Sequence, residues 1–443
     1  MLKRFLQEMC ATLMKFRMGV AIAYSELRQR FMSVLRSRLP ISTSTLNEKL
    51  STQRHDNEVN PVIEGSEFAY KATNIVLVNE DGVKTAAKLI RQRLLVESYT
   101  PRTWRTHPLH LLPSDPYVAL DPTNKSVLNW IFLISCLNFS FWSEKEGQPD
   151  RYSVEWRDKW DSSGKKLWTG YWSLVASLNR ALVDDDIPIT DPKFYSSEVL
   201  CPDSLIEHVF RRSPQSAESI PLLGERIAIM REVGSILCKN FDGSFQGFLD
   251  EFHRRHNGEG TALQLVQMVV DIFPTYRDEF IVNGEKVCFW KRAQILVAEI
   301  WAAFYPANST YPHPIFPGVR GPKIQQLTMF ADYRVPQILH HLCILDYPPS
   351  LLETLHTGTP LQSGASEEIS LRAASIIAVE RVKEEILKLF VEEGKCGEDT
   401  VSSVLIDFYL WDLAKKIENG EDRIKGMKTA KTVPIHRTRS IWY

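Results

Sequence analysis

Helical periodicity dominates this chain and limits the folds that it can adopt. Apolar side chains in residues 367–393 recur mostly at three- and four-residue steps, at Ile376, Val379, Val382, Ile386, Leu389 and Phe390. This spacing places them on one face of a helix. Similar patterns occupy residues 222–241, 263–273, 291–304 and 401–417. Strands do not alternate with helices, as they would in a parallel α/β sheet, so we predict an all-α or nearly all-α fold.

Three stretches interrupt the helical pattern. Residues 306–324 are rich in Pro and Gly and predict an irregular loop, while residues 282–287 surround an Asn-Gly pair that favours a small hairpin. Residues 40–60 are rich in Ser, Thr, Asn and charged side chains, which is typical of a linker. We therefore expect one globular domain over residues 61–443, preceded by a basic N-terminal extension and linker over residues 1–60.

The first forty residues differ from the rest of the chain in charge. They contain eight basic residues and two acidic ones, Glu8 and Glu26, with apolar residues at helical spacing. This arginine-rich, acid-poor pattern is typical of organelle transit peptides. A plain helical extension or a misassigned start codon fits the same residues. We expect a cytoplasmic protein, with mitochondrial targeting by the basic N-terminus as the alternative.

The longest apolar run, within residues 127–141, is interrupted by Asn129 and Asn138. A transmembrane helix requires about 20 consecutive apolar residues. The run therefore predicts a buried core helix, and we expect no membrane partner.

Composition and motifs argue against several classes of protein. The chain has 53 basic and 54 acidic residues, whereas a protein that grips a polyanion usually carries a basic excess, so we expect no direct contact with nucleic acid. The seven cysteines are odd in number and none has C-x-x-C spacing, so we expect no metal and no disulfide framework. The phosphate-binding, dinucleotide-binding and nucleophile-elbow motifs are missing, and we expect no cofactor.

Four dense polar–aromatic clusters remain as candidate sites, at residues 138–144, 289–294, 329–336 and 407–413. Aromatic rings held beside polar groups suit stacking on a heterocycle, although Trp142 fits a position in the core as well. Lys291 stands at a predicted helix start, where it meets either an anion or only solvent.

The aspartates of these clusters have two interpretations each. Asp332 lies among apolar and aromatic neighbours, so it either pairs with Arg334 or stands beside developing positive charge. On a helix, Asp407 and Asp412 project about 140° apart, so both face one pocket only where the helix end enters it. Otherwise they are solvated groups that flank core aromatics.

Taken together, these segments resemble the queuosine salvage protein family, whose members are described as queuosine 5′-phosphate N-glycosylases. The resemblance covers residues 61–443 and is carried by LNFSFWSE (137–144), GYWSLVASLNRAL (170–182), IPIT (187–190), FPTYRDE (273–279), KRAQILVAEIW (291–301), LTMFADYRVPQIL (327–339), LIDFYLWDLAK (405–415) and IHRTRSIWY (435–443). It implies a helical fold similar to that of DNA glycosylases. The implied activity is hydrolysis of queuosine 5′-monophosphate, which releases queuine for salvage into tRNA modification.

The resemblance also implies roles for particular residues. Asp332 would be the catalytic carboxylate, with Lys291 as its neighbour. The substrate-binding candidates are His107, Phe330, Asp407, Phe408, Asp412, Arg334 and Trp142. His107 rests on a looser local match, because His110 lies close to it. Two positions depart from the family pattern, since Phe408 and Trp290 stand where tyrosine is usual.

Queuine carries carbon where a purine has nitrogen at position seven, so protonation there cannot assist its departure. The base must be stabilised through its other polar edges, for which Asp407 and Asp412 are suitable acceptors. Cations for the phosphate would come from Lys291, Arg334, Arg437 and Arg439.

Two other functions compete with the hydrolase. A non-catalytic carrier of queuine or its nucleotide would keep the aromatic pocket but would not need Asp332. A DNA or RNA glycosylase would need a basic face that follows phosphates.

Overall fold

Helices form most of the structure, which confirms the predicted fold class. The computed structural model describes residues 59–96, 99–308, 310–393, 401–418, 420 and 429–443. The helices are α3 (Pro61–Thr73), α4 (Glu80–Val96), η1 (Pro101–Thr106), α5 (Pro122–Cys136), α6 (Tyr171–Val183), α7 (Pro192–Tyr195), α8 (Asp203–Val209), α9 (Leu223–Asn240), α10 (Phe245–Arg255), α11 (Ala262–Ile272), η2 (Pro274–Tyr276), α12 (Lys291–Ala303), η3 (Ile324–Gln326), α13 (Val335–His341), α14 (Pro349–Thr357), α15 (Ser366–Glu392) and α16 (Ser403–Glu418). Residues 1–58, and with them the predicted basic extension, lie outside the described residues.

The five segments with helical periodicity are helices in the structure. Residues 222–241 form α9, 263–273 form α11, 291–304 form α12, 367–393 form α15 and 401–417 form α16, each within two residues of the predicted bounds. The apolar positions predicted for α15 are buried with one exception, because Leu389 is only partly covered. Periodicity was therefore a sufficient signal for these long elements.

The described strands occur only in three antiparallel pairs: β1 (Leu77–Val78) with β6 (Leu345–Asp346), β2 (Ser153–Arg157) with β3 (Lys165–Thr169), and β4 (Glu279–Val282) with β5 (Glu285–Cys288). The β4–β5 hairpin confirms the turn predicted at Asn283-Gly284. Both turn residues have positive φ, 49° and 87°, as a two-residue hairpin loop requires. The β2–β3 hairpin was not predicted.

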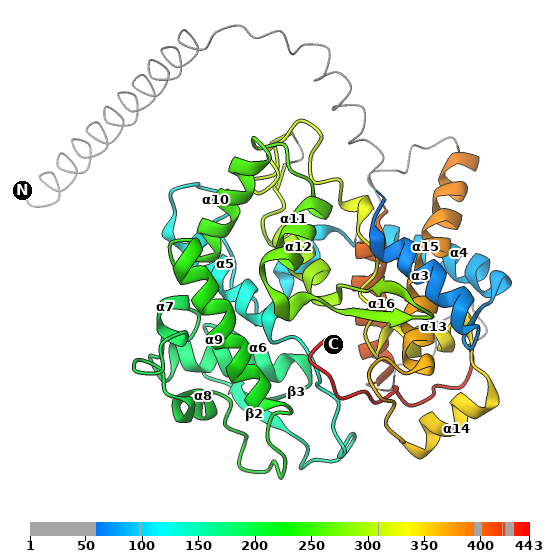
Figure 1. The fold of residues 1–443 in the computed structure, drawn as a ribbon, viewed down its shortest axis with the longest axis horizontal. Helices are drawn as coiled ribbons and strands as arrows, with labels where there is room; N and C mark the ends of the chain where they lie inside the picture. Colours follow the sequence, from blue (N-terminus) through cyan, green and yellow to red (C-terminus); the bar gives the residue numbers. More distant parts are fainter. Residues whose placement is uncertain (1–58, 97–98, 309, 394–400, 419, 421–428) are drawn as a thin grey trace, which may run out of the picture. The chain divides into compact units, whose positions relative to one another are not determined.

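Two groups of helices flank the centre of the unit Val59–Tyr443. Helices α3 and α4 pack on α15 at the right of Figure 1, while α5, α9 and α10 pack together at the left. Helix α12 contacts α5 and α11, and α16 contacts α13 and α15. Helix α12 thus contacts the group at the left, and α16 contacts the group at the right.

The predicted core helix within residues 127–141 ends earlier than expected. Helix α5 stops at Cys136, whose carbonyl accepts a hydrogen bond from Arg292. The chain then runs non-helically through buried residues 137–143. Their backbone is held from outside, because Arg226 donates to the Leu137 and Phe139 carbonyls at 2.5 and 2.6 Å. Side chains distant in sequence thus replace the helical hydrogen bonds of this segment.

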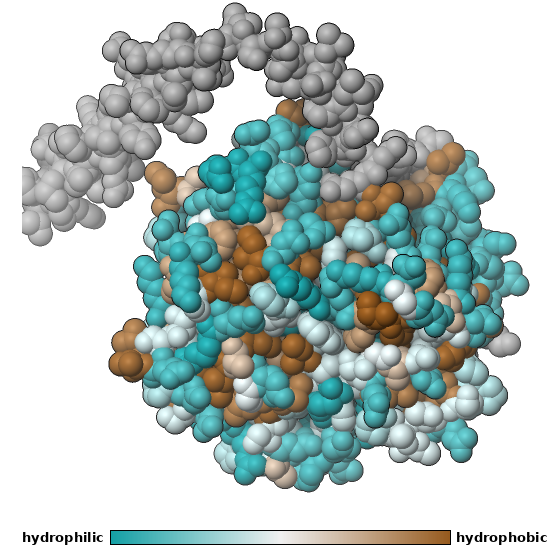
Figure 2. Space-filling model, in the orientation of Figure 1, coloured by the Kyte–Doolittle hydropathy of each residue, from teal (hydrophilic) through white to brown (hydrophobic). Residues whose placement is uncertain are grey.

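Within the described residues, no helix combines the length and the apolarity that a membrane span requires. The most exposed large apolar side chains, Leu120, Val199 and Val319, lie on separate loops. On the face drawn in Figure 2, apolar residues form patches that polar residues separate.

The close approach of α4 to the turn after α13 requires glycine at position 82. A methyl group there would lie 1.9 Å from the carbonyl oxygen of Cys343, whereas one at Gly224 of α9 meets nothing within 4 Å. We expect Gly82→Ala to lower the free energy of unfolding by about 1–3 kcal/mol or more. Gly224→Ala should leave it unchanged or raise it by about 0.4–1 kcal/mol. Urea unfolding of both variants tests this, and equal stability of the two would contradict the proposed contact.

Candidate active site

A cavity of about 310 Å³ lies where α12, α16, η1 and the loop before α13 meet. This volume lies within the range of about 300–1,000 Å³ that is typical of small-molecule sites. Its lining includes every predicted site residue except Arg334 and Trp142, namely Lys291, Asp332, His107, Phe330, Asp407, Phe408 and Asp412. Residues far apart in sequence are therefore brought together around one space.

The first turn of α12 carries three polar side chains, at Lys291, Arg292 and Gln294, and each has different partners. Lys291 enters the cavity, where its Nζ donates to the carbonyl and side-chain oxygens of Asn138 at 3.3 and 3.5 Å. Arg292 points the other way and donates to the Cys136 and Thr275 carbonyls. Gln294 donates to Thr328 Oγ1 at 2.8 Å and accepts from the Thr328 amide at 3.0 Å. The lysine is thus held in a turn whose other polar groups are satisfied.

The loop that carries Asp332 is fixed at successive residues. Before Asp332 in the chain, the Gln294 side chain binds Thr328, and the Phe330 amide donates to Asp407 Oδ1 at 2.9 Å. The next carbonyl, of Ala331, accepts from Arg372 Nε at 3.0 Å. Since each bond comes from a different helix, the loop has little freedom to move relative to α12, α15 or α16.

The Asp332 carboxylate is oriented by the start of α13. Its Oδ1 accepts two amide hydrogen bonds of 2.8 Å, from Arg334 and Val335. Among the described residues no hydrogen bond engages Oδ2, and the side chain lines the cavity. The first alternative from the sequence, an ion pair with Arg334, is not observed, because the Arg334 guanidinium pairs with Glu418 at 3.2 Å.

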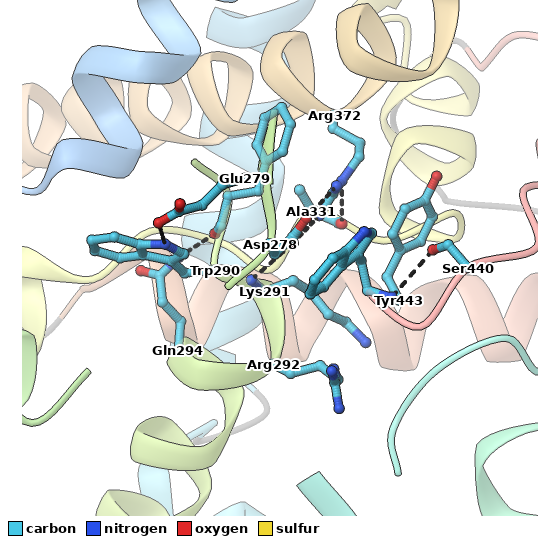
Figure 3. Close-up of polar contacts among 12 residues, drawn as sticks. Asp278, Glu279, Trp290, Lys291, Arg292, Gln294, Ala331, Arg372, Ser440 and Tyr443 are labelled. Carbon is cyan, nitrogen blue, oxygen red and sulfur yellow. Dashed lines mark hydrogen bonds and ion pairs between the residues drawn. The ribbon is translucent and has the colours of Figure 1, made fainter. Parts of the chain in front are cut away.

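A buried cluster of charged residues contacts this loop (Figure 3). Arg372 of α15 pairs with both oxygens of Asp278, which precedes β4, and lies 3.5 Å from Glu368. The same Asp278 accepts from the backbone amide of Lys291 at 3.4 Å. Tyr443 completes the cluster by donating from its hydroxyl to Glu368 at 2.7 Å. The cluster therefore fixes the backbone at both proposed catalytic residues.

The ionisation of Lys291 is set by burial and by its neighbours. Burial lowers the pKa of this ammonium from 10.5 to about 8, and the nearby carboxylate of Asp332 opposes that decrease. The lysine is thus charged at neutral pH but loses its proton more readily than an exposed lysine.

The two aspartates of α16 both line the cavity. Burial, with the nearby charge of Asp332, raises the pKa of Asp407 well above its usual value. Asp412 lies one turn further along and accepts from the Tyr99 hydroxyl at 2.8 Å. The sequence had left open whether the two share a pocket. They do, and not through an end of the helix, because Phe408 and Trp411 between them line the same cavity along the middle of α16.

Aromatic rings form the cavity walls. The His107 ring stacks on Trp172 with centroids 3.4 Å apart, and its Nδ1 accepts from the Leu109 amide at 3.2 Å. Burial lowers the pKa of His107 to about 3, so the ring is neutral at physiological pH. On another wall the Phe330 and Phe408 centroids lie 6.0 Å apart. Flat apolar walls with polar groups at the edges suit a planar heterocycle.

Sequence reasoning missed a buried carboxyl group, that of Glu299. It lies eight residues after Lys291 on α12, with Ile295 between them, and all three line the cavity. The Tyr171 hydroxyl donates to it at 3.3 Å, and burial raises its pKa to about 7. The spacing of four and eight residues from Lys291 was the available signal, because such positions share one helix face.

Four other predicted candidates lie outside this cavity. Trp142 donates to the Thr438 carbonyl at 2.8 Å, and the Arg439 guanidinium lies 3.4 Å from the centroid of its ring. Arg439 also donates to the Ser140 and Trp142 carbonyls. Arg437 lies 3.3 Å from Glu144, and Arg334 has the contact with Glu418. In the described part of the chain, no cluster of His, Cys, Asp or Glu has an arrangement suited to a metal ion.

Comparison with known proteins identifies close relatives over most of the chain. Residues 118–443 match the queuosine salvage protein family. A protein of Schizosaccharomyces pombe is 38% identical over 394 residues, covering 86% of this chain and 99% of the relative. One from Mus musculus is 36% identical, with 86% and 98% covered, and one from Sphaerobacter thermophilus is 33% identical, with 83% and 93% covered. All three are named queuosine 5′-phosphate N-glycosylase/hydrolase.

Burial of Glu299 predicts a pH-dependent cost to stability. Its pKa rises from 4.5 to about 7 on folding, so between these values the folded chain binds more protons than the unfolded one. Stability therefore falls as pH rises through this window, by up to about 3 kcal/mol. We expect Glu299→Gln to be more stable than wild type at pH 8 and similar to it at pH 4.5. Urea unfolding at both pH values checks this, and a stability difference independent of pH would contradict it.

Proposed function

This chain belongs to the queuosine salvage protein family, and we propose that it hydrolyses the N-glycosidic bond of queuosine 5′-phosphate and releases queuine. The observation that carries the proposal is the Asp332 carboxylate, which two amides orient at the edge of an aromatic cavity. An N-glycosyl hydrolase requires such a carboxylate beside the sugar and flat walls around the base.

In the proposed reaction, the bond from C1′ to the base breaks and its electron pair leaves with the base. Positive charge then develops on the ribose ring, and Asp332 stabilises it. A water molecule adds to C1′ on the face of the carboxylate, which orients the water and accepts one of its protons. The products are queuine and ribose 5-phosphate, and the proton lost by water balances the one that the base gains.

The departing base needs a proton or a strong hydrogen-bond donor, because carbon at position seven cannot accept a proton. Asp407 is suited to this task, since its raised pKa favours the protonated carboxyl group. It is also positioned, because its Oδ1 accepts from the Phe330 amide and Phe330 itself lines the base cavity. Asp412 and Glu299 are then available as acceptors for the donor groups of the base and its aminomethyl arm.

Lys291 supplies the positive charge nearest to these carboxyl groups. Its charge attracts the Asp332 carboxylate, and its contact with Asn138 fixes the ammonium at the cavity wall. The charges of Arg292 and Arg372 also act on Lys291, but both side chains lie outside the cavity lining and are bound to other groups in the core. We assign Lys291 to balancing charge beside Asp332 in the cavity.

Replacement of the proposed catalytic carboxylate tests the reaction itself. We expect Asp332→Asn to lower queuine release from queuosine 5′-phosphate by about 10²–10³-fold, because transition-state charge is no longer opposed. Asp271→Asn, at an exposed position, is the matched control and should keep wild-type activity. Mass spectrometry of the released base provides the measurement. A carrier protein would bind the nucleotide without releasing base in either form, and equal turnover by Asp332→Asn would disprove the catalytic assignment.

Titration of Lys291 predicts the alkaline limit of activity. Since the ammonium loses its proton as pH rises through about 8, kcat/KM should fall with an apparent pKa near that value. Lys291→Arg keeps a positive charge over this range, so its remaining activity should not show the same decrease. The comparison requires kcat/KM for both proteins from pH 6 to 9.5. An identical alkaline decrease in the variant would assign the titration to another group.

A further inference from the structure

The residue before Lys291 has a backbone conformation that a bulky side chain rarely adopts. Trp290 has φ 47° and ψ 36°, in the left-handed region, and it is the only aromatic residue with a positive φ in the described part of the chain. The Cβ atom crowds the backbone in this region, so the conformation persists only where surrounding contacts enforce it. The contacts that hold Trp290 therefore bear on the placement of Lys291.

The start of helix α12 differs from the common pattern because of this conformation. Helix α11 begins after an extended residue, Thr261, whose side chain accepts from an amide of the first turn. Trp290 forms no such cap. Instead, the Lys291 amide donates to Asp278 Oδ2 at 3.4 Å, and the Gln294 amide donates to the Trp290 carbonyl at 3.0 Å. The left-handed residue thus places the lysine at the first position of α12, where its side chain lines the cavity.

The indole of Trp290 is anchored on the β4–β5 hairpin (Figure 3). Its Nε1 donates to Glu279 Oε1 at 3.2 Å, and the second carboxylate oxygen of Glu279 pairs with Lys286 at 2.7 Å. The Trp290 side chain is buried and does not belong to the cavity lining. Any effect of Trp290 on a reaction in the cavity therefore passes through its neighbour Lys291.

The acceptor of the Lys291 ammonium is positioned in a similar way. Asn138, whose two oxygens accept from Lys291 Nζ, lies two residues before Ser140, which has φ 56°. The Ser140 amide donates to the Tyr443 carbonyl at 2.8 Å. Backbone in the left-handed region thus adjoins both partners of this contact, and hydrogen bonds to other segments hold it in place.

We propose that Trp290 is a positioning residue for Lys291, and that its hydrogen bond to Glu279 holds the ammonium at its place in the cavity. The proposal rests on the proposed function, in which this lysine balances charge beside the catalytic carboxylate. The alternative is that the bond only joins the hairpin to α12. In that case, loss of the indole N–H lowers stability and leaves the surroundings of the ammonium unchanged.

The surroundings of Lys291 make a change in its position measurable. Burial is the largest cause of its low pKa, and Arg292 and Arg372 add to that decrease. The Asp332 carboxylate opposes it, and Asp407, whose own pKa is raised by burial, faces the ammonium from α16. Because burial has the largest effect, release of the side chain from this position should raise its pKa toward the usual value of 10.5.

The first test is kinetic and uses Trp290→Phe, which keeps a buried ring but removes the N–H donor. We expect kcat for queuosine 5′-phosphate to fall by about threefold or more while KM stays within about twofold, because the charge of Lys291 acts on the transition state. Trp156→Phe is the control and should keep wild-type kinetics, since this ring is also buried and lies outside the cavity lining. Equal kinetics of the two variants would overturn the proposal.

A double-mutant cycle tests the role of Glu279. Glu279→Ala removes the acceptor, so it should lower kcat as Trp290→Phe does, and the double variant should be no slower than either single variant. Glu279→Gln keeps an acceptor oxygen and should retain most of the activity. Additive effects of Trp290→Phe and Glu279→Ala would overturn the proposed anchor.

Acylation of Lys291 gives a measurement that does not depend on turnover. Trace acetic anhydride modifies only the neutral amine, so mass spectrometry of the modified peptide from pH 6 to 11 yields its pKa. We expect about 8 in wild type and in Trp156→Phe, and a higher value in Trp290→Phe. An unchanged pKa in Trp290→Phe would overturn the proposal.

The same measurement separates the two proposals. If wild type releases no queuine, the proposed function fails, and acylation still decides whether Trp290 positions Lys291. Circular dichroism shows whether each variant is folded. If Trp290→Phe does not fold, Glu279→Ala and Glu279→Gln provide the same comparison, and equal pKa values of Lys291 in these two variants would overturn the proposal.

Discussion

The buried guanidinium of Arg372 is the interaction on which the arrangement of the site depends. Removing this charge from water is costly unless every donor finds a partner. Here Asp278 and the Ala331 carbonyl accept hydrogen bonds from it, and Glu368 forms an ion pair with it at 3.5 Å. The guanidinium carbon also lies 4.2 Å from the ring centroid of Phe289 and 4.4 Å from that of Tyr443. Apart from Glu368 on the same helix, these partners belong to three distant segments, so one buried charge fixes the positions of the β4–β5 hairpin, the loop before α13 and Tyr443 relative to α15.

The site itself is built from ionisable groups in unfavourable environments. Its described lining has one ammonium group, that of Lys291, and four carboxyl groups, at Glu299, Asp332, Asp407 and Asp412. Burial raises the pKa of Glu299 and Asp407 and lowers that of Lys291, so the fold gives up stability to hold these groups in the cavity. Asp332 differs in its contacts, because two backbone amides orient its carboxylate. The fold thus places one carboxylate in a fixed orientation beside two carboxyl groups, of Glu299 and Asp407, whose pKa is raised.

The parts of the structure that could be predicted depend on local signals. Helix α15 and the β4–β5 turn follow from periodicity and from an Asn-Gly pair, both of which act within a few residues. The end of α5 at Cys136 could not be predicted, since Arg292 and Arg226 determine it from 89 residues or more away. Within the site, resemblance to the family supplied the residues, but only the fold could separate Trp142, which serves the core, from Glu299, which faces the cavity.

The role of Tyr443 has a consequence for the order of events during translation. The cavity lining runs from Tyr99 to Tyr443, and the Tyr443 carbonyl accepts from the Ser140 amide at 2.8 Å. A ribosome adds residues from the N-terminus, and the most recent ones are still inside its exit tunnel when earlier ones begin to fold. Helices α3 to α15 can therefore assemble while the guanidinium of Arg372 still lacks one aromatic face. The nascent chain acquires a closed site only after residue 443 has emerged, so synthesis of the whole globular unit precedes any turnover.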